Sequence, residues 1–462
     1  MSKRELPVAE GQEVELAITG VNHRGEGVGR YNGFTLFVPR SIPGETIRAR
    51  VTELKKNYAG AELLQVVQAS ERRVSPGCPV FESCGGSQLQ HMDYALQLET
   101  KTRQVADAVK RIGKLGEITV HPTLGMAQPW HYRNKAQYQI TRVGDKIKMG
   151  FYEEETHHVV PVTKCLLLDR QITEVAVLTE ELLNKYQLEA YDRGTGKGLL
   201  RHVVIRKAWH SGNLMVVLVT TSGDFPQQQQ LAGEYQDKIP TVVSVVRNIN
   251  DRPQGPVFGR ETRLLAGQET IIEQIGELEF EISPTSFFQV NPVQMAVLYE
   301  KVREYAALTG RETVLDVYCG IGTITLFLAD QARRVIGLEI HQQAVVDAAA
   351  NAELNGVDNT EFIAGSAEEL LPDLTGQGIR ADVVVVDPPR KGVDKKALQA
   401  IADMAPQRII YVSCDPASMA RDLEVLSHQG YRAVEIQPVD MFPQTSHVES
   451  IVLMTNSGLK GK

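Results

Sequence analysis

Cys414 is the residue of this sequence with the clearest potential for covalent chemistry. It follows the apolar run 409–412, which predicts a buried strand, and Asp415-Pro416 predicts the start of the next helix. The thiol is therefore expected at the carboxyl end of a strand, the edge at which open parallel sheets bind their ligands. A cysteine in that position is either a small packing residue or a nucleophile.

A second motif predicts a site for a cofactor that contains a nucleoside. An apolar strand enters a turn with Gly320 and Gly322, a helix follows, and the next strand ends in Glu339. The Glu339 carboxylate can accept hydrogen bonds from ribose hydroxyls. Because the loop opens with Asp316 and has only two glycines of the dinucleotide fingerprint, it favours S-adenosylmethionine over NAD. A dehydrogenase is the alternative.

Two further carboxylates lie at strand ends, and the residues beside the first of them indicate which kind of methyl transfer is possible. Asp387-Pro388-Pro389-Arg390 follows a strand of valines. Enzymes that methylate exocyclic base nitrogens have an aromatic residue after the prolines, and RNA cytosine-5 enzymes have a cysteine in this loop, so Arg390 argues against both. Glu449, just before the last strand, is a candidate general base. The alternative is an ordinary carboxylate in a turn.

The other cysteines are few and scattered. Cys78 and Cys84 lie beside Gly85-Gly86, where two thiols can face a metal or cluster, or the loop can be held by packing alone. Cys319 in the cofactor loop is interpreted as a packing residue. Five cysteines are an odd number and too sparse for a disulfide framework, which suits a reducing compartment.

Three regions are predicted to position these residues. Residues 7–69 contain short alternating strands separated by turns, typical of a small all-β, OB-like barrel. Residues 70–283 predict a mixed α/β central domain. From 284 to 462 strands and helices alternate strictly, which predicts an α/β, Rossmann-like domain with a doubly wound sheet.

The charge distribution favours RNA as the partner. The formal net charge of −8 argues against indiscriminate coating of nucleic acid, but residues 101–148 contain ten Lys or Arg against three acids, with Trp130, Tyr132 and Tyr138 interleaved. Cations for phosphates and flat rings for unstacked bases are features of RNA recognition. A second basic group lies at 193–207. The alternative is a solvated charged surface.

The sequence contains no signal-peptide pattern at its start and no run of about 18 apolar residues. We therefore expect a soluble, cytoplasmic protein with no membrane partner, and we expect it to act as a monomer.

Three motifs in chain order carry a family resemblance: Asp387 to Arg390, Ser413-Cys414-Asp415-Pro416, and His447-Val448-Glu449. Together with the loop at 316–323, they closely resemble the RNA (uracil-5-)-methyltransferase family. Residues 287–291, Phe-Phe-Gln-Val-Asn, match the segment through which the family contacts its cofactor. The motifs at 23–27 and 37–39 resemble a TRAM domain, an RNA-binding barrel. The resemblance covers essentially the whole chain.

The resemblance implies a role for each site residue. Cys414 is implied as the nucleophile and Glu449 as the base. The implied contacts of S-adenosylmethionine are Gln289, Tyr318, Glu339 and Asp387. Thr323 and Ser366 stand where some members make further contacts, and Asp387 could instead bind the uracil imide.

The implied chemistry explains why a thiol is needed. Carbon 5 of uracil is too weakly nucleophilic to take a methyl group unaided, and a thiolate that adds at C6 places electron density on C5. The C5 proton must then leave so that the thiol can be expelled. The target uridine must be flipped out of any stack to reach Cys414.

The resemblance also implies a [4Fe-4S] cluster and a ribosomal substrate. Family members hold the cluster with four cysteines; Cys78, Cys84 and Cys165 match three of them, and Ser87 stands in place of the other. The cluster is therefore expected with three cysteines, in a labile form, or not at all. Members with the TRAM barrel act on 23S ribosomal RNA, which is the implied partner. Transfer RNA, or a role as a non-catalytic RNA-binding assembly factor, is the alternative.

Overall fold

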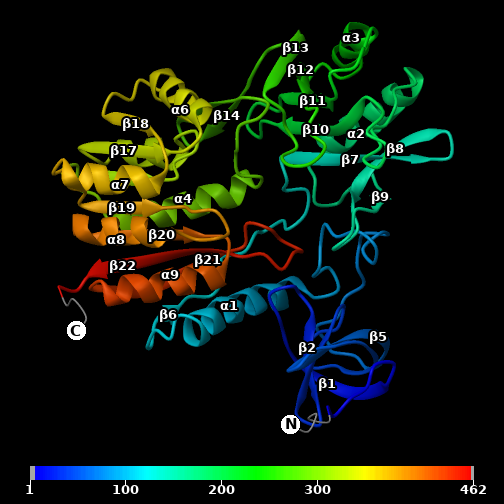
Figure 1. Cartoon of the computed structure of the whole chain (residues 1–462), viewed down its shortest axis with the longest axis horizontal. Coiled ribbons are helices and arrows are strands. Elements are labelled where there is room, and N and C mark those ends of the chain that lie inside the picture. The colour runs from blue at the N-terminus through cyan, green and yellow to red at the C-terminus, as the bar shows by residue number, and fades with distance from the viewer. Residues whose placement is uncertain (1–5, 459–462) are drawn as a thin grey trace.

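Three main sheets organise residues 6–458, which are the residues that the computed structural model describes. A closed barrel lies at the amino end, a seven-stranded sheet follows, and an eight-stranded sheet lies at the carboxyl end. In Figure 1 the barrel lies below the central sheet, and the C-terminal sheet forms the other side of the molecule. This arrangement confirms the predicted fold class, an α/β protein with an all-β barrel.

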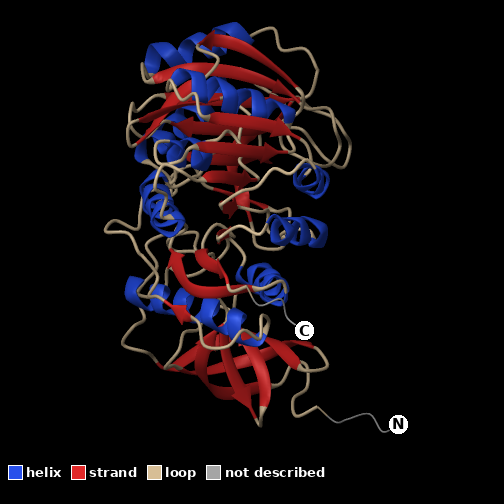
Figure 2. Ribbon diagram, turned by 90° about the vertical axis from the view of Figure 1, so that its left-hand side faces the viewer, coloured by secondary structure: helices blue, strands red, loops and turns tan. Residues whose placement is uncertain are grey.

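The barrel forms because each of its strands buries alternate residues. Its strands pair in the order β1-β2-β3-β5-β4, and Val14, Leu16 and Ile18 of β1 all point into the barrel core. Figure 2 shows the strands closing on themselves at the lower end of the molecule. The strands are β1 (Glu13–Val21), β2 (Gly27–Tyr31), β3 (Phe34–Val38), β4 (Thr46–Leu54) and β5 (Tyr58–Gln68).

The segment after the barrel packs against the C-terminal sheet. Helix α1 (Tyr94–Arg111) buries Val105 and Val109 in the same apolar core as that sheet, and β6 (Thr119–Val120) pairs in parallel with β21 (Tyr431–Val439). Both elements fall within the expected central region 70–283, so this region contributes to two sheets. The expected domain boundaries after residues 69 and 283 stay predictions.

The central sheet is mixed and is covered on both faces. Its order is β13-β12-β11-β10-β7-β8-β9, with β11 and β12 parallel. Helices α2 and α3 cover one face, and the hairpin β14–β15 packs against the other. The elements are β7 (Lys135–Val143), β8 (Lys146–Tyr152), β9 (Val159–Pro161), α2 (Arg170–Lys185), β10 (Leu200–Lys207), β11 (Leu214–Thr220), α3 (Gln228–Lys238), β12 (Val242–Ile249), β13 (Glu261–Gly267), β14 (Ile271–Ile275) and β15 (Leu278–Ile282).

The C-terminal sheet has the order β18-β17-β16-β19-β20-β22-β21-β6. Strands β16 to β20 are parallel, and β22 is antiparallel to both of its neighbours. The elements are α4 (Pro292–Ala306), β16 (Thr313–Val317), α5 (Thr323–Ala329), β17 (Arg334–Glu339), α6 (Gln342–Leu354), β18 (Thr360–Ala364), α7 (Ala367–Gly376), β19 (Val383–Val386), α8 (Lys395–Met404), β20 (Arg408–Ser413), α9 (Pro416–His428), β21 (Tyr431–Val439) and β22 (Glu449–Asn456).

The sheet topology determines where a ligand can bind. The chain passes from β16 to β17 on one side and later to β19 on the other, so the strand order reverses at β16. Open α/β sheets bind ligands outside the carboxyl ends of the strands at such a switch point. The Gly320 turn and the Pro388-Pro389 turn both follow strands at this edge.

Candidate active site

One cavity of about 830 Å³ lies at the carboxyl ends of β16, β17, β19 and β20. The structure brings every predicted catalytic and cofactor-binding residue into its lining, although these residues are spread over 160 positions of the chain. They are Gln289, Tyr318, Thr323, Glu339, Ser366, Asp387, Cys414 and Glu449.

Strand pairing brings Cys414 next to Glu449. Ser413, the last residue of β20, pairs with Ser450 of the antiparallel strand β22. One further step in this register sets Cys414 opposite Glu449, at the separation of neighbouring antiparallel strands. Asp415 caps α9 by accepting a hydrogen bond from the Ser418 amide at 2.7 Å, which fixes the turn around the thiol.

The ionisation of both groups is strongly perturbed. Burial raises the pKa of Cys414 to about 11, and the carboxylates of Glu449 and Asp387 add to the effect. Burial, with a smaller contribution from Asp387, raises the pKa of Glu449 to about 8. Perturbed groups that face each other in a cavity are typical of catalytic sites. At neutral pH the thiol and the Glu449 carboxyl are both mainly protonated.

Arg390 is a site residue that the sequence analysis did not assign to catalysis. Its charge lowers the pKa of both Cys414 and Glu449, against the effect of burial, and its Nη2 lies 3.3 Å from Nε2 of His447. Arg390 follows the Asp-Pro-Pro turn at the end of a strand, and this position in the sequence could have indicated that it lies in the site. Its cation favours the thiolate and carboxylate forms that chemistry at this site needs.

We predict that the rate of methyl transfer rises with pH. The reaction that the family resemblance implies uses the Cys414 thiolate and the Glu449 carboxylate, and because both pKa values are raised, both reactive forms become more abundant as pH increases from 6 to 9. Single-turnover rates at saturating cofactor and RNA measure this effect, with the affinity for S-adenosylhomocysteine at each pH as the control. A rate that is flat or falls over this range contradicts the assignment.

Glu339 is held ready to accept hydrogen bonds from a ligand. Its carboxylate accepts bonds from the amides of Gly320 at 3.1 Å and His341 at 2.8 Å, which fix it at the end of β17. Each carboxylate oxygen keeps a lone pair for a ribose hydroxyl. Tyr318 lines the same cavity from the Gly turn, where its backbone has a positive φ of 71°.

Asp316 completes the cofactor half of the cavity. Its Oδ2 accepts a hydrogen bond from Thr325 at 2.6 Å, but Oδ1 is buried and has no partner among the described residues. Burial raises the pKa of this carboxyl to about 7. A buried, unpartnered carboxylate oxygen fits a cationic ligand group such as the ammonium of S-adenosylmethionine. The sequence showed Asp316 at the start of the loop, but not its unpartnered oxygen.

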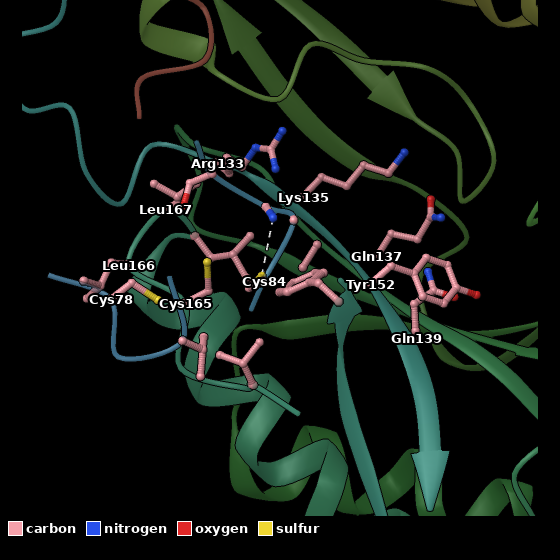
Figure 3. A pocket seen from close by; sticks show the side chains of 18 of the residues that line it. Cys78, Cys84, Arg133, Lys135, Gln137, Gln139, Tyr152, Cys165, Leu166 and Leu167 are labelled. Atoms are coloured by element: carbon pink, nitrogen blue, oxygen red, sulfur yellow. Dashed lines mark hydrogen bonds between the residues drawn. The ribbon is translucent and has the colours of Figure 1, made fainter. Parts of the chain in front are cut away.

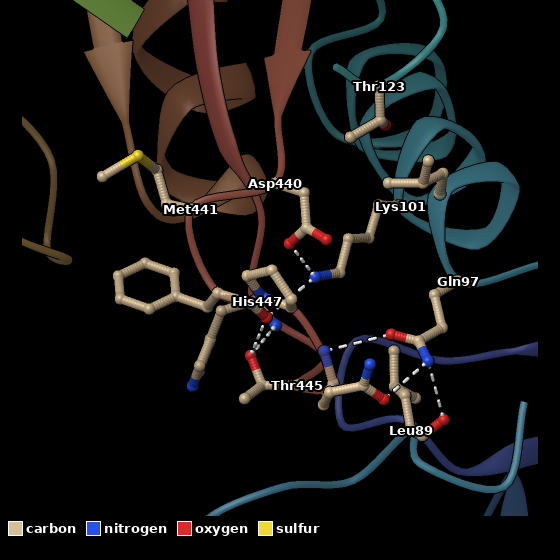
Figure 4. A network of polar contacts seen from close by, with 12 residues as sticks. Leu89, Gln97, Lys101, Thr123, Asp440, Met441, Thr445 and His447 are labelled. Atoms are coloured by element: carbon tan, nitrogen blue, oxygen red, sulfur yellow. Dashed lines mark hydrogen bonds and ion pairs between the residues drawn. The ribbon is translucent and has the colours of Figure 1, made fainter. Parts of the chain in front are cut away.

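A buried network of hydrogen bonds and one ion pair joins the loop between β21 and β22 to α1 (Figure 4). Lys101 and Asp440 form an ion pair in which both side chains are fully buried. Lys101 also donates to the Phe442 carbonyl at 3.1 Å, and the Tyr94 hydroxyl donates to Asp440 at 2.9 Å. Gln97 exchanges two hydrogen bonds with Gln444. The first half of the loop between β21 and β22, which carries His447, is thereby held against α1.

Lys101 corrects one expectation from the sequence. It was counted among the basic residues of 101–148 that were predicted to meet RNA, but its side chain is fully buried against Asp440. Lys135 of the same segment is half-buried, and burial lowers its pKa to about 7. Charge counts along the sequence do not distinguish such buried pairs from surface cations.

We predict that Lys101→Met destabilises the protein by about 3–5 kcal/mol, because it leaves the Asp440 carboxylate buried and uncompensated. Urea unfolding measures the change. The control is Arg111→Ala on the same helix, whose side chain is 75% exposed and whose loss changes stability by less than about 1 kcal/mol. The double variant Lys101→Met/Asp440→Asn should recover part of the loss; equal stability of Lys101→Met and wild type would contradict the role of the pair.

The residues predicted to hold a metal cluster line a separate cavity of about 410 Å³ (Figure 3). Cys78, Cys84 and Cys165 face it together with Ser87. Burial raises the pKa of both Cys84 and Cys165. Among residues 6–458 no group of three or more His, Cys, Asp or Glu side chains is arranged to hold a metal ion. The Gly86 amide donates to the Cys84 sulfur at 3.4 Å.

The fold and the cavity with Asp316, Glu339 and Asp387 define a methyltransferase that uses S-adenosylmethionine. The family model described as tRNA (Uracil-5-)-methyltransferase matches residues 259–457, and the TRAM domain model matches residues 7–64. The chain belongs to the RNA (uracil-5-)-methyltransferase family, as the relatives below also show. It is an enzyme, which removes the alternative of a non-catalytic assembly factor.

The relatives span the whole chain. A protein of Halalkalibacterium halodurans named as an uncharacterized RNA methyltransferase is 45% identical over 98% of this chain and 99% of its own length. A protein of Clostridium tetani with the same description is 44% identical over 100% of both chains. These matches include the barrel, the central sheet and the C-terminal sheet.

A solved structure resembles the fold over nearly the same range. The tRNA (uracil-54, C5)-methyltransferase of Pyrococcus abyssi, in complex with S-adenosyl-L-homocysteine, is 29% identical and covers 96% of this chain and 100% of its own, with a TM-score of 0.76. In the described part of this chain, no helix is both long and apolar enough to span a membrane.

Proposed function

We propose that this enzyme transfers a methyl group from S-adenosylmethionine to C5 of uridine in 23S ribosomal RNA, through a covalent bond between Cys414 and C6. The product is 5-methyluridine. The observation that carries the proposal is the single cavity that joins Cys414 and Glu449 to the cofactor residues Glu339 and Asp387.

The first half of the reaction belongs to Cys414. Its thiolate adds to C6 of the flipped uracil, and the electron pair of the C5–C6 double bond moves to form an enolate. The cation of Arg390 favours the thiolate. S-adenosylmethionine, when bound, supplies an electrophilic methyl group on a sulfonium. Glu339, Gln289, Tyr318 and Asp387 would hold this donor beside carbon 5. Transfer to carbon 5 would break the sulfur–methyl bond and leave S-adenosylhomocysteine.

The second half belongs to Glu449. The methylated adduct still carries a proton on C5, and the Glu449 carboxylate accepts it. The electrons of the C5–H bond re-form the C5–C6 double bond, and the Cys414 thiolate leaves C6. A pKa of about 8 lies close to working pH, which suits a group that must take a proton and then lose it.

The choice of RNA rests on the accessory regions. The TRAM barrel and the motif at Cys78 and Cys84 resemble the members that act on 23S ribosomal RNA. Transfer RNA is the second candidate, because the Pyrococcus abyssi tRNA enzyme covers 96% of this chain. Such coverage includes most of the barrel, so the barrel alone does not separate the two RNAs.

The experiment that tests the target compares RNA from cells with and without the protein. Nucleoside mapping of 23S ribosomal RNA is expected to lose 5-methyluridine at one or more positions in the deletion strain, and purified enzyme should restore it with S-adenosylmethionine. Loss of 5-methyluridine from transfer RNA alone would favour the second candidate. We expect the enzyme to act as a monomer, since one chain supplies all the residues of the site. The sequence analysis also predicts that it acts in the cytoplasm.

We also propose that Cys78, Cys84 and Cys165 bind an iron–sulfur cluster through three thiolates. The thiols share one cavity, and Arg133 lines it with positive charge that would offset thiolates. The Ser87 hydroxyl oxygen accepts a hydrogen bond from the Gln90 side chain at 2.7 Å, and Ser87 stands in place of the remaining cysteine ligand. Iron analysis and the absorbance spectrum of anaerobically purified protein test this proposal. Iron-free wild-type protein, with the same spectrum as Cys165→Ala, would contradict it.

A further inference from the structure

A cavity of about 680 Å³ in the central sheet lies apart from the cofactor cavity and adjoins the cysteine cavity, with which it shares Gln139 and Tyr152. We call it the β7 pocket; its rim carries Arg142, Arg193 and Lys197, and its floor carries Arg201 and His202. It shares no lining residue with the cofactor cavity. Its volume falls in the range of pockets that bind small ligands, about 300–1,000 Å³.

The rim of the β7 pocket is an open cationic surface. Arg193 and Lys197 are exposed, and neither forms an ion pair with a carboxylate among the described residues. Arg142 donates to the Gly144 carbonyl at 3.2 Å and has a long contact of 3.8 Å with the exposed Asp145. The nearby Asp192 carboxylate accepts hydrogen bonds from the Thr195 amide at 2.8 Å and the Thr195 hydroxyl at 3.2 Å. The rim cations are therefore available to an anion.

The floor contains buried polar atoms without partners. The Arg201 side chain donates to the Asn250 carbonyl at 2.9 Å, but its Nε has no partner in the described part of the chain. Nδ1 of His202 is likewise unpartnered, and these two residues are only 9% and 5% exposed. Burial and the neighbouring Arg193 and Arg201 lower the pKa of His202 to about 4, so its ring is neutral. Unpartnered buried groups of this kind indicate a polar ligand.

The walls provide flat surfaces for a base. The guanidinium of Arg201 lies over the Tyr191 ring at 4.3 Å, and that of Arg193 lies over the Tyr152 ring at 5.8 Å. The His157 ring meets Tyr152 edge to face at 5.4 Å. Unstacked RNA bases are held on aromatic rings and on guanidinium planes of this kind.

We infer that the β7 pocket binds one unstacked nucleotide of the substrate RNA, separate from the uridine that reaches Cys414. The rim cations meet the phosphate, and the rings of Tyr152 and Tyr191 meet the base. The inference rests on the proposed function, because it assumes that the substrate is RNA with an unpaired segment.

Strand β7 links the two sites. Asn134, just before β7, donates through its amide to the Val290 carbonyl at 2.9 Å and through its side chain to the Gln289 carbonyl at 3.2 Å, so β7 begins beside the cofactor cavity. Lys135, Gln137 and Gln139 follow on one side of the strand (Figure 3), and Gln139 also lines the β7 pocket. From Lys135 to Thr141 the strand spans about 20 Å. The β7 pocket thus lies toward the other end of the strand from the cofactor cavity.

The test measures binding of a fluorescein-labelled single-stranded RNA 20-mer at several salt concentrations. Arg193→Ala/Lys197→Ala is expected to weaken binding about tenfold or more and to make the salt dependence less steep, since two phosphate contacts are lost. Tyr191→Ala is expected to weaken binding about tenfold with an unchanged salt dependence, since stacking is lost. The matched control is Arg311→Ala, an exposed arginine near the opposite, amino end of β16.

If Arg193→Ala/Lys197→Ala binds the RNA with the same affinity and the same salt dependence as the wild type, the inference is overturned. S-adenosylhomocysteine binding should be equal in all variants, which verifies the fold. Methyl transfer by the wild type to 23S ribosomal RNA is measured in parallel. If it is absent while the binding differences hold, the proposed function fails, and the inference that the β7 pocket binds a nucleotide is still supported.

Discussion

Cys414→Ala is expected to lose uridine methylation, by on the order of 10⁴-fold or more, while it still binds S-adenosylmethionine and RNA. The reason is chemical, because without a thiolate at C6 no electron density builds up on C5 and the methyl group has no acceptor. The thiol lines the cavity but forms no hydrogen bond with any residue of 6–458, so its removal is expected to leave the structure intact. Transfer of tritiated methyl groups to RNA measures the loss.

The matched control is Cys319→Ala, which removes another thiol from the same cavity. Cys319 is 6% exposed, and burial raises its pKa much further above the ordinary range than that of Cys414, which favours the interpretation of Cys319 as a packing residue. We expect its methylation rate to stay within several-fold of the wild-type rate. Full activity in Cys414→Ala, or equal losses in the two variants, would contradict the assignment of the nucleophile.

Glu449→Gln is expected to lower turnover by about 10²–10⁴-fold for a different reason. The amide has nearly the same shape as the carboxyl but cannot accept the C5 proton. Addition of Cys414 and transfer of the methyl group can still proceed, so the methylated adduct should accumulate. A denaturing gel then shows a protein–RNA band that carries the labelled methyl group.

The two variants are expected to differ in how much of this adduct they form. Cys414→Ala should form none, and Glu449→Gln should form more than the wild type. The double variant should behave as Cys414→Ala does, since the base acts only after the nucleophile. Loss of turnover in Glu449→Gln with no adduct would mean that Glu449 acts before methyl transfer, and it would require another group to take the C5 proton.

The sequence predicted individual strand ends well because each is a local pattern. The alternating residues of β1 predicted the barrel, and the apolar runs before Asp387 and Cys414 predicted strands of the C-terminal sheet. The Gly320 turn and Glu339 predicted the cofactor site, since both follow neighbouring strands. These predictions need only the periodicity of one element at a time.

The sequence could not predict contacts that depend on distant pairing. Cys414 and Glu449 meet because β22 runs antiparallel to β20, and strand direction is not visible in an apolar run. Lys101 and Asp440 are 339 residues apart, so nothing near either one signals the pair. Segment 94–120 precedes the central sheet in the chain but packs on the C-terminal one, where β6 finds an open edge beside β21.

The central claim is a covalent bond between the Cys414 sulfur and C6 of uracil, and RNA with 5-fluorouridine at the target position tests it directly. Fluorine at C5 cannot leave as a proton does, so the methylated adduct cannot break down. With wild-type enzyme and S-adenosylmethionine, we predict a stable protein–RNA complex whose protease digest contains one modified peptide, with the methylated fluorouridine attached to Cys414. A nucleotide attached to another residue, or no complex under conditions in which unmodified RNA is methylated, would contradict the claim.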